Sequence, residues 1–179
     1  KISESGNQEF KVKGGGFPYG LSTDIDGNAL LFLKSGVFQL VDDSIIQSDD
    51  FIDFNLPHDP TQVYYNSKDH IAYYLTNRGV FMVSKQEIEE LSFYEGKYVN
   101  GLLQNGDTLY IHTAATTDIW IGDSLVKQIP NSYRKADRTE FSTTKEGVVW
   151  EAHDRGIRRI NPDFTYEDFG KGYYMPMLT

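Results

Sequence analysis

A pattern of short apolar runs and polar turns recurs four times along the chain. Each copy has a polar-ended run, a tight turn, an apolar run, a second turn and another apolar run. The copies contain "LSTDIDGNALLFLKSGVFQL", "VYYNSKDHIAYYLTNRGVFM", "LLQNGDTLYIHTAATTDIWI" and "EFSTTKEGVVWEAHDRGIRRI". Aligned at the second turn, the anchor positions are spaced by 43, 39 and 38 residues, and they are Gly36, Gly79, Asp118 and Gly156. The chain therefore repeats with a period of about forty residues.

Within one copy the pattern is that of an antiparallel meander. The runs are rich in β-branched and aromatic residues, and turn sequences such as "DIDGN", "NSKD", "NGD" and "TKEG" separate them. A fourth, less apolar run follows in "SIIQSDD", "SLVKQI" and "TYEDF", which is typical of an exposed edge strand. Four-stranded units at this period predict an all-β fold, a segment of a β-propeller with about four four-stranded antiparallel blades. A β-sandwich is the structural alternative, but it would not require the period.

The repeat sets the expected organisation of the chain. We expect residues 1–179 to form a single propeller segment that is part of a larger propeller, with aromatic side chains filling the spaces between blades. The aromatics in question are Tyr73, Phe81, Trp120 and Trp150. The expected blades span about 17–56, 61–99, 100–131 and 137–169, and strands of neighbouring blades are expected at 8–14 and 172–179.

One segment of the second copy has a helical pattern instead. Ser84 and Glu87 have the spacing of a capping box, and Ile88 and Leu91 fall on one face of a helix that follows it. We therefore expect a short surface helix over residues 85–91.

Composition excludes several classes of protein. A net charge of -9 disfavours nucleic acid as a partner, because an acidic surface repels phosphate. The absence of cysteine excludes disulfides, thiolate chemistry and cysteine-bound metal. The apolar run "ALLFL" is far too short to span a bilayer, so membrane attachment is expected only through parts outside this chain. A start at Lys1 without an apolar signal segment indicates either a cytoplasmic chain or one whose targeting sequence has been removed.

The order of residues in the copies resembles the repeat of the two-component regulator propellers. Those repeats read roughly Gly-Leu-Pro, a polar strand, Asp-x-x-Gly, an apolar strand often containing Trp, and Gly-Leu. The matching residues are Gly16, Phe17, Pro18, Asp24, Gly27, Gly36 and Val37 in the first copy and Gly147, Trp150, Gly156 and Ile157 in the fourth. The first two copies depart from the pattern, since Phe32 and Tyr74 stand where Trp is usual.

The resemblance implies a location and a role. Its members are extracytoplasmic, periplasmic sensor domains of bacterial histidine kinases or hybrid two-component proteins, often sensing glycans. They usually have many more than four blades, and the full receptor is expected to be able to form a homodimer. The chain would then be a ligand-sensing segment of such a receptor.

A catalytic centre is not apparent in the sequence. The four histidines, His58, His70, His112 and His153, are scattered over the copies, and the chain contains no Gly-x-Ser-x-Gly nucleophile elbow. "DIDGN" lacks the further ligands of a calcium loop and is interpreted as a hairpin turn. We expect no catalytic residues, no metal and no cofactor. Carboxylate pairs capable of glycoside hydrolysis remain open, because 26 acidic residues always bring some pair together.

Ligand binding is the remaining role for the loops on one face of a propeller. The loops after the second strands contain Lys34, Arg78, Asp154 and Arg155, and the loops between blades contain Phe17, Tyr19, His58 and Tyr133. Aromatic rings stack on sugars and charged groups bind hydroxyls or carboxylates, so these residues predict an oligosaccharide or other small-molecule ligand, especially an acidic one. A propeller-based polysaccharide-active enzyme, either a glycoside hydrolase or a lyase, and a protein-interaction platform are the alternatives.

Overall fold

The described part of the chain folds into four separate four-stranded antiparallel sheets that follow one another along the sequence. The computed structural model describes residues 17–42, 44–131, 139–153 and 156–170. In each sheet the strands are adjacent in space in their order along the chain, as in a meander. The predicted all-β fold with four-stranded antiparallel blades is therefore confirmed. The expected flanking strands at 8–14 and 172–179 lie outside the described residues.

The sheets are named blades 1 to 4 in chain order. Blade 1 contains β1 (Gly20–Thr23), β2 (Ala29–Leu33), β3 (Gly36–Val41) and β4 (Ser44–Gln47). Blade 2 contains β5 (Pro60–Asn66), β6 (Ile71–Thr76), β7 (Gly79–Val83) and β8 (Ile88–Glu90). Blade 3 contains β9 (Val99–Asn105), β10 (Thr108–Thr113), β11 (Thr116–Ile121) and β12 (Ser124–Pro130). Blade 4 contains β13 (Thr139–Thr143), β14 (Val149–His153), β15 (Gly156–Ile160) and β16 (Tyr166–Phe169).

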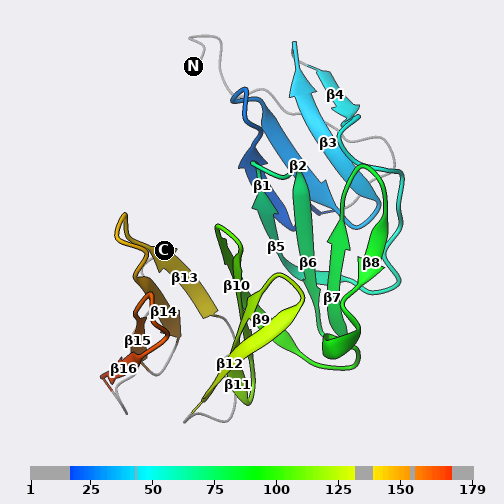
Figure 1. Ribbon diagram of the computed structural model, residues 1–179. Coiled ribbons are helices and arrows are strands. Elements are labelled where there is room, and N and C mark those ends of the chain that lie inside the picture. Colours follow the sequence, from blue (N-terminus) through cyan, green and yellow to red (C-terminus); the bar gives the residue numbers. More distant parts are fainter. Residues whose placement is uncertain (1–16, 43, 132–138, 154–155, 171–179) are drawn as a thin grey trace.

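The blades follow an arc, with their first strands on its inner side (Figure 1). β1 contacts β5, β5 contacts β9 and β9 contacts β13, so neighbouring blades approach each other through these first strands. The approach is close at Gly101 in β9, where a Cβ would lie only 2.8 Å from the Cβ of Thr139 in β13. This radial arrangement is that of a propeller and not of two face-packed sheets.

The hydrophobic core lies between the blades. Alternate residues of each strand face opposite neighbours, so Tyr74 in β6 packs toward blade 1 and Tyr73 packs toward blade 3. Phe81 and Trp120 also lie between blades, as expected from the sequence. Trp150 does not fill a space between described blades: it is 36% exposed, and its ring lies beside that of Phe169 within blade 4.

The first turn of blade 1 explains the Asp-x-x-Gly pattern. The Asp24 carboxylate accepts hydrogen bonds from the backbone amides of Asp26 and Asn28 and from the side chain of Gln39. Gly27 closes the turn with a φ of +86°, which other residues rarely adopt. "DIDGN" is therefore a hairpin turn whose acid is occupied by the protein's own donors.

The second turn of each blade shows where the sequence alignment was wrong. Gly36, Gly79 and Gly156 each open the third strand of their blade, with positive φ values of 151°, 159° and 156°. In blade 3 the corresponding position is Thr116, the first residue of β11, whose carbonyl accepts a hydrogen bond from the Thr113 hydroxyl across the turn. Asp118 lies inside β11 and is 1% exposed, so it is a buried strand residue and not a turn anchor.

The helix expected over 85–91 is also wrong. The Ser84 hydroxyl accepts hydrogen bonds from the amides of Gln86 and Glu87, but these bonds close a turn, and the chain then enters β8, which pairs with β7. A serine hydroxyl can accept these hydrogen bonds in a turn as well as at the start of a helix. Here the residues after the turn pair with β7 and do not form a helix. The described residues include a short 3₁₀ helix, η1 (Ser92–Tyr94), and no helix long and apolar enough to cross a membrane.

Candidate functional site

The turns after the second strands and the connectors between blades meet at one end of blades 1 and 2. The carbonyl of Lys34, in the turn after β2, accepts a hydrogen bond from the amide of Leu56 in the connector at 3.1 Å. In the next blade the carbonyl of Arg78 accepts one from the amide of Gly96 at 2.6 Å. Each connector thus holds the preceding turn in place, which fixes the loops on this face.

A polar hollow of about 330 Å³ lies between these loops. We call it the rim hollow, and its lining residues are Lys34, Pro57, His58, Asp59, Asn77 and Arg78. The structure therefore brings together three residues that the sequence had selected as ligand-binding, namely Lys34, His58 and Arg78. They come from three loops of two adjacent blades.

The two cations of the rim hollow differ in their surroundings. The Lys34 ammonium lies 2.8 Å from the Asp59 carboxylate, with both side chains partly exposed to solvent. Arg78 has no carboxylate partner among the described residues. The turn that carries Arg78 is held by a hydrogen bond from the Arg78 amide to the hydroxyl of the buried Thr76. Arg78 is therefore the cation of this hollow that remains available to an anionic group.

The sequence missed the role of Asp59. Nothing in the segment "HDP" at residues 58–60 shows that its acid reaches a lysine 25 positions earlier. The cations in the second turns were the signal for this site, and they identified Lys34 and Arg78 but not Asp59, the partner of Lys34.

The other predicted ligand-binding residues are not brought into the rim hollow. Tyr19 precedes β1 and its amide donates to the carbonyl of Phe32, so it lies at the same end of blade 1 but does not line the hollow. Phe17 is 86% exposed and is also not part of it. Asp154, Arg155 and Tyr133 lie outside the described residues. The described hollow is polar and offers no aromatic platform.

A second cluster of polar residues was missed by the sequence analysis, and it lies between blades 3 and 4. The carboxylate of Glu151 in β14 accepts a hydrogen bond from the Thr117 hydroxyl at 2.8 Å and is also hydrogen-bonded to Nδ1 of His112. The Arg158 guanidinium lies 3.4 Å from the same carboxylate and donates to Asn131 at 2.8 Å. Glu151 is completely buried and Arg158 is 2% exposed. We call these five residues the buried polar cluster.

Two opposing effects act on the pKa of Glu151. Burial raises the pKa of this carboxyl. The hydrogen bond and charge of His112, the charge of Arg158 and the hydrogen bond from the Thr117 hydroxyl lower the pKa by more than burial raises it, so the net shift is downward. Arg158 is held in turn by Asp168, whose carboxylate accepts from Nε at 2.7 Å. The cluster is therefore a saturated ionic network that joins the two blades.

The buried polar cluster has the residue types of acid–base chemistry but not the exposure. The side chains of His112 and Glu151 are 4% and 0% exposed, and the Thr117 hydroxyl donates to Glu151. A nucleophile and its base must reach a substrate, whereas these groups are satisfied by one another. In the part of the chain that the structure describes, no group of three or more His, Asp or Glu residues is arranged to hold a metal ion.

Solved structures with a similar fold come from several classes of protein. No family model and no curated protein matches the sequence. Virginiamycin B lyase from Staphylococcus aureus is 14% identical over 96% of this chain and 62% of its own, with a TM-score of 0.66. The extracellular domains of two putative hybrid two-component systems from B. thetaiotaomicron are 14% and 18% identical, with TM-scores of 0.64 and 0.61. They are matched over 97% and 88% of this chain and 23% of their own.

These similarities establish the propeller fold. The chain spans a little over half of the lyase and about a quarter of the two-component extracellular domains. The two-component regulator propellers to which the repeat pointed are thus represented among the structural neighbours. A gluconolactonase from Xanthomonas campestris is another neighbour, 12% identical with a TM-score of 0.59, so the same fold also carries enzymes.

Proposed function

We propose that this chain is a ligand-sensing segment of an extracytoplasmic, periplasmic two-component receptor, and that it binds an acidic oligosaccharide at the rim hollow. The observation that carries the proposal is the convergence of Lys34, His58 and Arg78 on one polar hollow from three loops. The extracellular domains of two-component systems among the structural neighbours support the sensor role.

The chemistry of the hollow favours a carboxylate on the ligand. The planar guanidinium of Arg78 can donate two parallel hydrogen bonds to a carboxylate, and its own charge is not already neutralised by an acid in the described part of the chain. His58 and Asn77 supply groups that hydrogen-bond to sugar hydroxyls. Lys34 contributes less, because its ammonium is paired with Asp59.

The position of the hollow suits a sensor. It lies between the loops of blades 1 and 2, so a ligand that contacts both Lys34 and Arg78 would bridge two rigid sheets. A ligand shifts a conformational equilibrium only if it binds the two states with different affinity. A ligand that contacts both blades would distinguish states that differ in the relative position of the blades. Occupancy would then pass to the rest of the receptor as a change in how the blades are arranged.

The proposal is tested by calorimetric titration of the chain with oligogalacturonate and with a neutral malto-oligosaccharide of equal length. Arg78→Ala is expected to weaken oligogalacturonate binding by about tenfold or more, since a hydrogen bond to a charged group contributes about 1.5–3 kcal/mol. Arg159→Ala, which removes the same charge from blade 4, is the matched control and should leave the affinity unchanged. Equal binding of the neutral sugar, or equal weakening by the control, would overturn the proposal.

A polysaccharide-active enzyme is the second candidate. The lyase and the gluconolactonase among the structural neighbours favour it, because they show that this fold supports catalysis. An assay for new reducing ends after prolonged incubation with the acidic oligosaccharide separates the two functions. Release of reducing ends that Arg78→Ala abolishes would favour the enzyme, and binding without any release would favour the sensor.

A further inference from the structure

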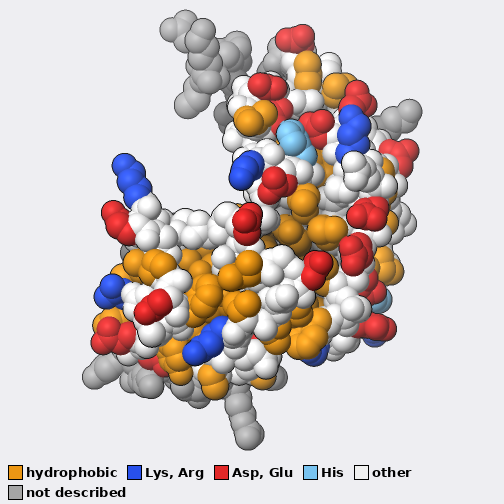
Figure 2. All heavy atoms as spheres, viewed as in Figure 1, with side chains coloured by type: hydrophobic (Ala, Val, Ile, Leu, Met, Phe, Trp, Pro, Cys, Tyr) orange, Lys and Arg blue, Asp and Glu red, His pale blue; other side chains and the backbone are white. Residues whose placement is uncertain are grey.

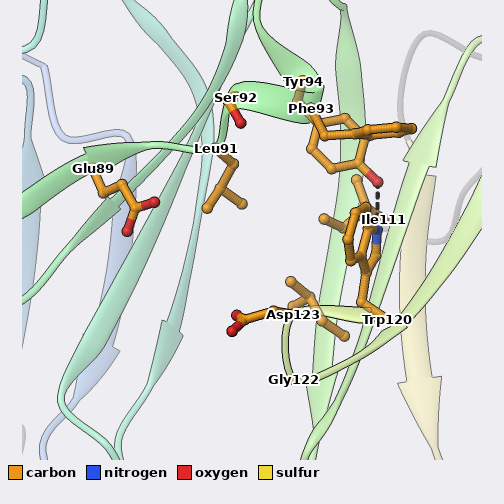
Figure 3. A pocket seen from close by; sticks show the side chains of 10 residues that line it. Glu89, Leu91, Ser92, Phe93, Tyr94, Ile111, Trp120, Gly122 and Asp123 are labelled. Carbon is orange, nitrogen blue, oxygen red and sulfur yellow. Dashed lines mark hydrogen bonds between the residues drawn. The ribbon is translucent and has the colours of Figure 1, made fainter. Parts of the chain in front are cut away.

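A second hollow, about 220 Å³ in volume, lies between the outer parts of blades 2 and 3. One wall is aromatic, formed by Phe93 and Tyr94 of η1 and Trp120 of β11 (Figure 3). Leu91 contributes to its apolar surface, and Glu89 of β8 and Asp123 of the turn before β12 bring carboxylates to it. We call it the side pocket. It shares no residue with the rim hollow.

The aromatic wall is held rigidly. The three rings pack edge to face, with centroids 5.2 Å apart for Phe93 and Tyr94 and 5.3 Å apart for Phe93 and Trp120. Nε1 of Trp120 donates to the Tyr94 hydroxyl at 2.8 Å, and that hydroxyl donates to the buried Asp118 at 2.9 Å. The wall is therefore ordered before any ligand arrives, which removes much of the entropic cost of binding.

Negative charge surrounds this wall. The side chains of Glu89 and Asp123 extend toward the same gap from two different blades (Figure 3). Neither has an ion-pair partner within the described ranges. Behind the rings, the carboxyl group of Asp118 accepts hydrogen bonds from Tyr94 and Gln128, and no described residue forms an ion pair with it. The pocket thus combines an apolar aromatic surface with carboxylates on two sides.

The protein already places an ammonium group on this aromatic cluster. Nζ of Lys97 lies 3.7 Å from the ring centroid of Phe93 and 5.5 Å from that of Tyr94. A ring face attracts a cation through its quadrupole, so the contact shows that these rings accept a positive group in the folded protein. Lys97 is exposed, and its charge would repel a second cation nearby.

We propose that the side pocket binds a small organic ammonium ion that carries one aromatic ring. The ring packs against Trp120 and Leu91, and the ammonium group lies between Glu89 and Asp123. The pocket is smaller than the roughly 300–1,000 Å³ of sites for larger ligands, which limits the occupant to about one ring and a short chain. An anionic ligand is disfavoured by the carboxylates, and a neutral one leaves them without a partner.

Phenethylammonium and its neutral analogue 2-phenylethanol are the probes that test this inference. The Trp150→Phe variant leaves Trp120 as the only tryptophan, so its fluorescence reports on the side pocket. We expect saturable quenching by phenethylammonium, with binding of 2-phenylethanol weaker by about tenfold. The same titration of the unaltered chain by calorimetry gives the result independently of that substitution.

Charge variants separate a specific site from general attraction to an acidic protein. Glu89→Gln and Asp123→Asn should each weaken phenethylammonium binding by about two- to fivefold, the effect of one exposed charge pair. Lys97→Gln should strengthen it by a similar factor. Glu167→Gln, on the exposed strand β16 of blade 4, is the matched control and should have no effect. Equal binding of the neutral analogue, absence of saturable binding, or an equal effect of Glu167→Gln would overturn the inference.

Discussion

Two interfaces of the same architecture are held together by different chemistry. Blades 1 and 2 meet through buried apolar side chains such as Leu30, Phe32 and Tyr74. Blades 3 and 4 also share an apolar cluster, but at one end it gives way to the buried polar cluster around Glu151. Apolar packing depends little on pH, whereas a buried carboxylate stabilises the interface only while all its partners are present. The fold thus needs the radial stacking of blades but not one particular kind of contact.

The connector between blades 1 and 2 fills the space beside their apolar interface, whereas the connector between blades 2 and 3 leaves part of the space beside their interface unfilled. Phe51 and Phe54 of the segment between blades 1 and 2 are buried against Phe32 and Tyr74. In the segment between blades 2 and 3 only Tyr94 is buried, while Phe93 remains 41% exposed. The side pocket lies where this second connector leaves the space between blades unfilled.

The two halves of the described chain also differ at the surface. Figure 2 shows apolar side chains gathered over blades 3 and 4, and acidic ones spread over blades 1 and 2.

The largest expected effect comes from removing the central acid of the polar interface. Glu151→Ala leaves His112 without its carboxylate partner and Arg158 with Asp168 as its remaining acid in a buried site, which should lower the free energy of unfolding by about 3–5 kcal/mol. Urea unfolding at pH 7 measures the loss. Glu167→Ala on the exposed β16 is the control and should change stability by no more than about 0.5 kcal/mol. Similar losses in the two variants would show that the network does not hold the blades together.

A cavity in the apolar interface should cost somewhat less. Leu30→Ala removes a fully buried side chain between blades 1 and 2, and we expect a loss of roughly 2–5 kcal/mol, depending on how far the neighbours relax. The loss should be the same at pH 7 and pH 4, because no charged group is involved. A loss that changes with pH would mean that the two interfaces are not independent.

Acidification should weaken the polar interface alone. The pKa of Glu151 is lowered in the folded chain. The ionised carboxylate therefore contributes fully to the free energy of unfolding at a pH above the usual pKa of a glutamate, and this contribution is lost as the pH falls through the lowered pKa. The unaltered chain should therefore lose stability as the pH falls below the ordinary pKa of a glutamate carboxyl, about 4.3. Glu151→Gln, which has no carboxyl to protonate, should lose less over the same interval. Parallel curves for the two proteins in urea unfolding would contradict this account.

The smallest stability effect is expected at the rim hollow. Asp59→Asn removes the partner of Lys34 from an exposed ion pair, so stability should change by no more than about 1 kcal/mol. The freed ammonium should at the same time strengthen oligogalacturonate binding by a few fold, as measured by calorimetry. Weaker binding in this variant would indicate that Asp59 contacts the ligand itself.

The repeat made the fold predictable because blades depend on local patterns. Turn residues such as Asp24 and Gly27, and alternation along strands, act within one blade and can be recognised in sequence. The errors arose where that local pattern is ambiguous. Thr116 replaces the glycine of the second turn, and the Ser84 turn has the spacing of a helix cap. The tertiary structure decides both cases.

The candidate sites were predictable only in part. Lys34 and Arg78 occupy equivalent turns, so the repeat itself placed them on one face. The pairing of Lys34 with Asp59, and of His112 with Glu151, joins residues that are 25 and 39 positions apart. A charged residue at an inward position of a strand, such as Glu151 between Val149 and His153, was the available signal for the buried polar cluster. Its partners His112 and Thr117 come from blade 3 and could not be inferred without the packing, whereas Arg158 lies opposite Glu151 on the neighbouring strand β15.

The rim hollow between blades 1 and 2 is the proposed ligand site. Chemical-shift mapping of the ¹⁵N-labelled chain during titration with oligogalacturonate tests it most directly, because each backbone amide reports separately. We expect the largest chemical-shift changes at Lys34, His58, Asn77 and Arg78, and unchanged shifts at Phe93 and Trp120. Shifts that cluster outside the rim hollow, or no saturable shifts at all, would contradict it.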